Sequence, residues 1–155
     1  MSRRRAKAIL SFRNALVLIL GLGLAGCGLL RSQGPSINLT MTAGLEDTQA
    51  IEILALPEPG QQAQKPEQVV AVITEPKDIH RIVEALDSSL QLVPRALCLE
   101  RYRLRFQRPE GEAVTFGYSC DAGGVFLRGD QSFWRGMEVV PPEDFQELIG
   151  GYLRD

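Results

Sequence analysis

Two neighbouring segments of this 155-residue chain alternate strictly between apolar and polar residues. Successive side chains of a strand point to opposite faces, so each segment predicts a strand with one buried face. Residues 108–111, Arg-Pro-Glu-Gly, are typical of a turn between two antiparallel strands. The apolar residues of the two segments are Tyr102, Leu104, Phe106, Val114, Phe116 and Tyr118.

A simple register keeps all these apolar side chains on one face of the hairpin. Pairing residues whose numbers add up to 218 puts Leu104 opposite Val114. The same register puts Cys98 opposite Cys120, and there the two Cα atoms lie within the distance that a disulfide spans.

Further stretches predict more strands. Residues 51–56 and 68–74 are mostly apolar, and the second stretch is rich in β-branched residues, as strands are. Residues 37–41 alternate and predict either a short edge strand or the end of a tether.

A second hairpin is predicted after the first. Residues 125–128 and 132–135 form its two strands, which places Phe133 and Trp134 on opposite faces. Residues 137–140 extend the sheet.

Two helices complete the expected fold. The first begins at Pro76, and the second begins at Pro142 and ends at Gly150-Gly151. The sequence therefore predicts an α+β domain, a mostly antiparallel sheet of about five to six strands with two helices packed on one face. The apolar stripe of the first helix is Ile79, Ile82, Val83, Leu86 and Leu90.

The N-terminal segment has the three parts of an export signal in order. Residues 2–7 are strongly basic, residues 15–24 are apolar, and Leu24-Ala25-Gly26-Cys27 follows directly. This tetrapeptide resembles the lipobox of bacterial lipoproteins. The resemblance implies transfer of a diacylglyceryl group to the Cys27 thiol, cleavage before Cys27 and acylation of the new amino group.

The expected organisation has three parts. Residues 1–26 are the cleaved signal peptide, residues 27–35 a flexible tether, and residues 36–155 one small domain. The expected location is extracytoplasmic, lipid-anchored to the bacterial cell membrane, and the sequence leaves open which membrane. The alternative is an uncleaved single-span anchor, which the short and glycine-containing apolar run disfavours.

Charge separates the signal from the domain. Residues 1–26 hold five of the 17 basic residues and none of the 19 acidic ones, so the remainder has a net charge of −7. An acidic domain argues against a nucleic-acid partner and is repelled by anionic lipid. Membrane attachment is therefore expected to depend on the acyl chains.

The three cysteines divide into the lipid site Cys27 and the pair Cys98 and Cys120. In an oxidising compartment the pair is expected to form a structural disulfide, with two buried free thiols as the alternative. Closing a loop of this size contributes about 3 kcal/mol in the chain-entropy model.

Catalytic chemistry has little support in the sequence. His80 is the single histidine, which excludes a His-based triad and a site with two histidine ligands. We therefore expect no enzymatic activity, no catalytic residues, no metal site and no cofactor beyond the covalent lipid at Cys27.

Three arginines lie on the polar face of the first alternating strand. Arg101, Arg103 and Arg105 predict either a face that binds an anion or an acidic partner, or arginines that pair with acids on adjacent strands. The leading hypothesis is a non-enzymatic envelope lipoprotein that binds an envelope protein or component. The alternative is an extracytoplasmic sensor of a small ligand or anion, and the oligomeric state stays open.

Overall fold

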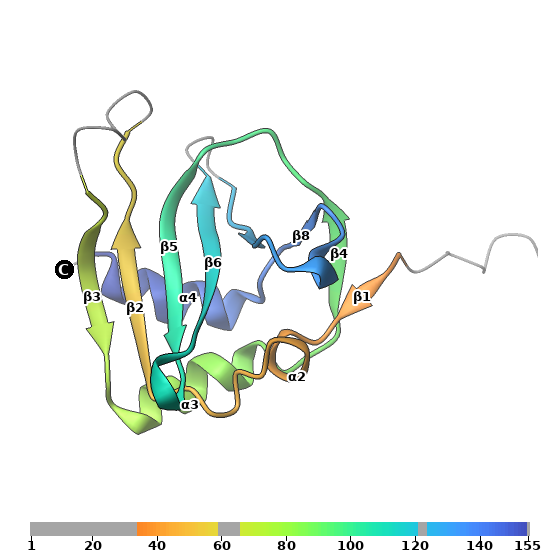
Figure 1. The fold of residues 1–155 in the computed structure, drawn as a ribbon. Helices are drawn as coiled ribbons and strands as arrows, with labels where there is room; N and C mark the ends of the chain where they lie inside the picture. The colour runs from red at the N-terminus through yellow and green to blue at the C-terminus, as the bar shows by residue number, and fades with distance from the viewer. Residues whose placement is uncertain (1–33, 59–65, 121–123, 155) are drawn as a thin grey trace, which may run out of the picture. The chain divides into compact units, whose positions relative to one another are not determined.

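One antiparallel sheet organises the protein, and α3 and α4 pack on one of its faces (Figure 1). The computed structural model describes residues 34–58, 66–120 and 124–154. Residues 34–155 form one unit and residues 1–33 another. The predicted signal peptide, Cys27 and most of the predicted tether therefore lie outside the described residues.

The strand order in the sheet is β1-β4-β8-β7-β6-β5-β2-β3, and neighbouring strands are antiparallel. The strands are β1 (Ser36–Ile37), β2 (Ala50–Ala55), β3 (Gln68–Ile73), β4 (Leu90–Pro94), β5 (Glu100–Gln107), β6 (Ala113–Cys120), β7 (Leu127–Arg128) and β8 (Met137–Val139). The helices are α2 (Leu39–Ala43), α3 (Pro76–Ala85) and α4 (Glu143–Tyr152), with 3-10 turns η1 (Pro109–Gly111) and η2 (Ser132–Trp134).

The α+β class and the antiparallel sheet agree with the prediction, but the number of strands does not. The sequence predicts about five to six strands, whereas the described residues form eight, with three α-helices. β4 falls where no strand was predicted, because Leu90 was assigned to the apolar stripe of the first helix. β1 and β7 overlap predicted strands but have only two residues each.

The central hairpin of β5 and β6 has the predicted faces but not the predicted register. Leu104 pairs with Phe116 instead of Val114, and Glu100 pairs with Cys120 where Cys98 was expected. The turn causes this difference, because the chain closes with a hydrogen bond of 2.7 Å from the Arg108 amide to the Glu112 carbonyl. A shift of two residues leaves each side chain on its face, so the apolar pattern does not detect it.

The predicted second hairpin is wrong in its second strand. Residues 132–134 form η2, and β7 pairs instead with β6 and β8. In η2 the Trp134 side chain lies in the core, and Phe133 packs against the core from its edge. The indole N–H of Trp134 donates to Gln131 Oε1 at 2.8 Å, which satisfies its polar atom.

The helices also differ from their predicted bounds. The first predicted helix ends at Ala85, and Leu90 is buried from strand β4. The last helix continues through Gly150 and Gly151 to Tyr152, because the Tyr152 hydroxyl donates to Asp78 on α3 at 2.9 Å. A contact between helices here outweighs the low helix propensity of glycine.

A single apolar cluster joins the inner face of the sheet to the helices. Its centre is aromatic: the rings of Phe106 and Phe116 lie 5.5 Å apart, and those of Phe116 and Trp134 5.6 Å apart. Tyr118 meets Phe145 of α4 in an edge-on contact of 6.1 Å. Of the predicted apolar residues of β6, Phe116 therefore packs within the sheet layer and Tyr118 contacts α4.

Burial of Tyr118 predicts a loss of stability at high pH. Burial raises the pKa of Tyr118 from 10.0 to about 12. A tyrosine whose pKa is raised on folding stabilises the protein below its unfolded pKa, and this contribution is lost as the pH rises from about 10 to about 12. We expect a decrease of roughly 2–3 kcal/mol in the free energy of unfolding over this range.

Urea unfolding of the wild-type protein and of Tyr118→Phe at a series of pH values measures this effect. Phenylalanine keeps the ring contact with Phe145 but cannot ionise, so the variant should lose less stability over the same pH range. Equal losses in the two proteins would show that Tyr118 is not the group responsible.

Candidate functional site

The sheet face opposite α3 and α4 carries the predicted arginine row. Arg105 on β5 lies opposite Glu52 on β2, and its Nη1 donates to Glu52 Oε2 at 3.0 Å. Arg103 pairs with Glu67, which also lies 3.8 Å from Arg105 Nη2. The two arginines are thus paired with acids, which is the second of the two interpretations given for the row.

Arg101 differs from the other two arginines. Its side chain is exposed, and no ion pair or hydrogen bond joins it to another residue in the described part of the chain. It therefore offers a charge that an external group reaches without competing with a protein carboxylate.

A polar recess of about 330 Å³ opens on the same face. Because Glu100 and three arginines surround it, the recess suits a ligand that carries both acidic and hydrogen-bonding groups. The recess is lined, among others, by Glu100, Arg103, Arg105, Arg128, Asp130 and Gln131.

At one side of the recess, Arg128 is buried between two carboxylates. Its Nε donates to Glu100 Oε1 at 2.8 Å, and its Nη1 lies 3.6 Å from Glu138 Oε2. Glu138 is fully buried in β8, and its Oε2 accepts no hydrogen bond from any described residue. A buried carboxylate of this kind depends on the neighbouring guanidinium for its charge.

Gly117 makes room for this arrangement. A Cβ atom on Gly117 would overlap the carboxyl group of Glu100, which turns across β6 towards Arg128. Glycine is the one residue type that leaves this space open. We infer that Gly117 is required for the ion pair.

Arg128 also holds the segment between β4 and β5. Its guanidinium donates to the carbonyls of Ala96 at 3.3 Å and Cys98 at 2.8 Å. The Ala96 amide in turn donates to Glu138 Oε1 at 2.9 Å. We call residues 95–99 the β4–β5 loop. The buried pair of Arg128 and Glu138 therefore holds this loop through the backbone of Ala96 and Cys98.

The two predicted disulfide residues are only partly described. Cys98 is disulfide-bonded, and its Sγ lies 3.8 Å from Arg128 Nη1. The side chain of Cys120 and all of Cys27 lie outside the described positions. The pairing of Cys98 with Cys120 therefore stays a prediction.

Arg128 and Glu138 have no counterpart in the sequence-based site. Each belongs to a strand of two or three residues, so no alternating pattern marks its face. The partners of Arg128 are also distant in sequence, with Ala96 32 residues away. One weak signal exists, because Arg128 directly follows the apolar run Val125–Leu127.

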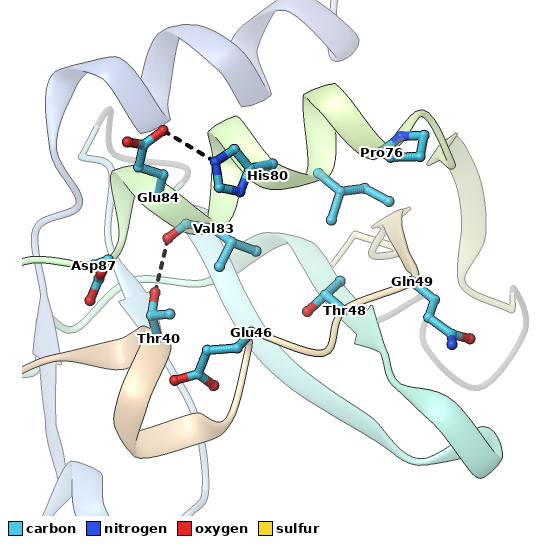
Figure 2. A pocket seen from close by; sticks show the side chains of 10 residues that line it. Thr40, Glu46, Thr48, Gln49, Pro76, His80, Val83, Glu84 and Asp87 are labelled. Carbon is cyan, nitrogen blue, oxygen red and sulfur yellow. Dashed lines mark hydrogen bonds and ion pairs between the residues drawn. The ribbon is translucent and has the colours of Figure 1, made fainter.

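A second hollow, of about 730 Å³, runs along α3 beside residues 40–49 (Figure 2). Most of the polar side chains that line it form hydrogen bonds or ion pairs with other residues of the domain. The hydroxyl of Thr40 donates to the Val83 carbonyl at 2.9 Å, and that of Thr48 donates to the Leu45 carbonyl at 2.7 Å.

The single histidine lines the same hollow. His80 is exposed, and its Nε2 lies 3.9 Å from Glu84 Oε2 on the next turn of α3 (Figure 2). Because both lining threonine hydroxyls donate to backbone carbonyls, His80 has no hydroxyl nucleophile to activate there. The hollow therefore gives no positive support for catalysis.

Comparison of the chain with protein-family models, with curated proteins and with solved structures gave no match. Within residues 34–58, 66–120 and 124–154, no three or more His, Cys, Asp or Glu side chains gather as metal ligands would. The helices in these ranges also include none with both the length and the apolar character needed to cross a bilayer.

The buried ion pair predicts an unequal cost of losing two arginines. Arg128→Met removes the charge that compensates Glu138, so the free energy of unfolding should fall by about 3–5 kcal/mol. The matched change at the exposed Arg101, Arg101→Met, should alter it by less than about 0.5 kcal/mol. Urea unfolding followed by circular dichroism measures both values.

The double variant Arg128→Met, Glu138→Gln shows how much of the stability loss is due to the uncompensated charge of Glu138 and how much to the lost packing of Arg128. It removes the uncompensated carboxylate, so it should be more stable than Arg128→Met alone. If Arg128→Met is no less stable than Arg101→Met, the buried pair does not hold this part of the fold.

Proposed function

We propose that the protein is a membrane-anchored bacterial lipoprotein whose domain is a non-enzymatic binding module of the cell envelope. The observation that carries this proposal is the tetrapeptide Leu24-Ala25-Gly26-Cys27, directly after a basic and then an apolar segment. Diacylglycerol at Cys27 and acylation of its amino group would hold the domain at the membrane.

The described fold is compatible with this proposal. The chain enters the sheet at β1, a few residues after Cys27, so a short tether joins the lipid site to the domain. The disulfide at Cys98 supports a location in an oxidising compartment.

The open face of the sheet is the proposed binding surface. It carries the polar recess, the exposed Arg101 and the arginine–glutamate pairs of β5. Complementary charges on two binding surfaces determine the orientation and specificity of the complex more than its affinity. The proposed partner is an envelope protein with acidic and polar groups that match this face.

The anchor is tested by changing its thiol. Cys27→Ser removes the nucleophile that receives the lipid, so the protein should lose its acyl mass and remain as precursor or be released from the membrane. Mass spectrometry of the N-terminal peptide and membrane fractionation after a high-salt wash measure both effects. Ser32→Ala, in the same segment, is the matched control and should change neither.

Two outcomes would contradict the anchor. A Cys27→Ser protein that is cleaved as before and stays in salt-washed membranes would exclude lipid attachment at Cys27. A wild-type protein that retains residues 1–26 would favour the uncleaved single-span anchor instead.

The binding surface is tested by photo-crosslinking in intact cells. A photoreactive amino acid at the exposed Asp130, beside the recess, should give a discrete protein adduct. The same amino acid at the exposed Lys77 on α3, away from this face, should not. Arg101→Glu should weaken the adduct at position 130 because it reverses the free charge on this face.

Adducts of equal yield at both positions, or none at position 130, would remove the open face as the binding surface. The alternative, an anion sensor, is favoured by one observation, the three arginines around a single recess. It predicts that inorganic phosphate raises the melting temperature of the wild-type protein, and that Arg103→Ala abolishes this increase.

A further inference from the structure

The β4–β5 loop presents apolar side chains to solvent. Leu97 is fully exposed and Leu99 is 49% exposed, although both lie on a segment that the buried Arg128 fixes. Two exposed leucines on a loop held by a buried side chain make this loop a candidate for a contact outside the domain. The position of the loop in the fold indicates what that contact is.

The chain enters the domain beside this loop. β1 runs antiparallel to β4, with Ser36 opposite Gln91 and Ile37 opposite Leu90. Pro35 and Gly34 therefore lie towards the carboxyl end of β4, where the loop begins. The Leu92 amide confirms this direction, because it donates to the Pro35 carbonyl at 2.8 Å. Figure 1 shows the start of β1 and the end of β4 at the same end of the sheet.

Covalent geometry limits how far the lipid site lies from this end of the sheet. Cys27 precedes Gly34 by seven residues, a fully extended length of at most about 24 Å. Leu97 follows Pro94, the last residue of β4, by three residues, at most about 10 Å. A membrane that holds an acylated Cys27 is therefore within reach of the end of the sheet that carries Leu97.

The charges beside the leucines fit a membrane surface. Arg95, at the start of the loop, keeps 42% of its side chain exposed, and its Nη2 donates to Glu100 Oε1 at 3.4 Å. Arginines beside apolar side chains suit the lipid interface, where the guanidinium contacts phosphate and the apolar groups enter the acyl boundary. Because the same Glu100 oxygen also accepts from Arg128 Nε at 2.8 Å, Arg95 shares this carboxylate and has further donors for a lipid phosphate.

We propose that the β4–β5 loop is a membrane-contact site. Leu97 and Leu99 enter the interfacial region of the bilayer that holds the N-terminal anchor, and Arg95 contacts lipid phosphates. The proposal rests on the proposed function, because the anchor brings the domain to the bilayer. The loop then fixes which end of the domain faces the lipid and leaves the open sheet face accessible to a partner.

Fluorescence quenching by brominated lipids tests the contact. Full-length Leu97→Trp, isolated from membranes, is reconstituted in vesicles of phosphatidylcholine and phosphatidylglycerol with brominated acyl chains. The new tryptophan should lose most of its emission and shift to shorter wavelength compared with vesicles of unbrominated lipid. The native Trp134 is buried, so its emission is the constant background.

Met41→Trp is the matched control. Met41 is 71% exposed on α2. Helix α2 follows the carboxyl end of β1, whereas Gly34 precedes its amino end. A tryptophan at position 41 should therefore keep its emission in brominated vesicles. Equal quenching at positions 41 and 97, or quenching at position 41 alone, would overturn the proposal.

The same samples separate this proposal from the lipid anchor. Vesicle flotation and the mass of the N-terminal peptide report whether the chain is anchored and acylated at Cys27. An acylated, floating protein without quenching at position 97 refutes the loop contact and leaves the anchor intact. An uncleaved N-terminal span refutes the lipid anchor but still tests the loop, because the chain enters the sheet at Gly34 in either case. A protein that does not float refutes both.

Discussion

The buried guanidinium of Arg128 is the constraint on which the other features of this end of the sheet depend. It forms a buried ion pair with Glu138, donates to the carboxylate of Glu100 beside Gly117, and donates to two carbonyls of the β4–β5 loop. Removing any one partner leaves a buried charge or an unpaired carbonyl, which is more costly than the pair is stabilising. The short strands β7 and β8 are therefore held together by the Arg128–Glu138 pair as well as by their ladder hydrogen bonds.

Long alternating segments allowed much of the fold to be predicted. The faces of β5 and β6 and the apolar stripe of α3 follow from periodicity, because each has several residues that repeat with one period. The register of the hairpin could not be predicted in this way, since a shift of two residues preserves each face. The extension of α4 through Gly150 and Gly151 depends on the contact of Tyr152 with Asp78, which a local pattern does not show.

The candidate site likewise has residues that the sequence pattern predicted and residues that it did not. Alternation placed Arg103 and Arg105 on one face, and pairing with acids on adjacent strands was one of the two expectations. Arg105 pairs in this way with Glu52 on β2, whereas Glu67, the partner of Arg103, precedes β3. Arg128 and Glu138 were not predicted, because burial of a charge is decided by partners that are distant in sequence. The exposed Leu97 likewise has no sequence signal, since a leucine in a loop gives no indication of whether the loop covers the core. The candidate surfaces of the domain thus depend on contacts between residues that are distant in sequence.

The lipobox-like tetrapeptide, the direction of β1 and the exposed β4–β5 loop together support our proposal that this loop of the domain contacts the membrane. Paramagnetic relaxation with a gadolinium-chelating lipid tests this orientation in the unaltered protein. In lipid nanodiscs, the amide signals of residues 95–99 should be broadened most and those of α2 least, because broadening decreases steeply with distance from the bilayer surface. Stronger broadening of α2 than of the β4–β5 loop, or equal broadening of the two, would contradict the account.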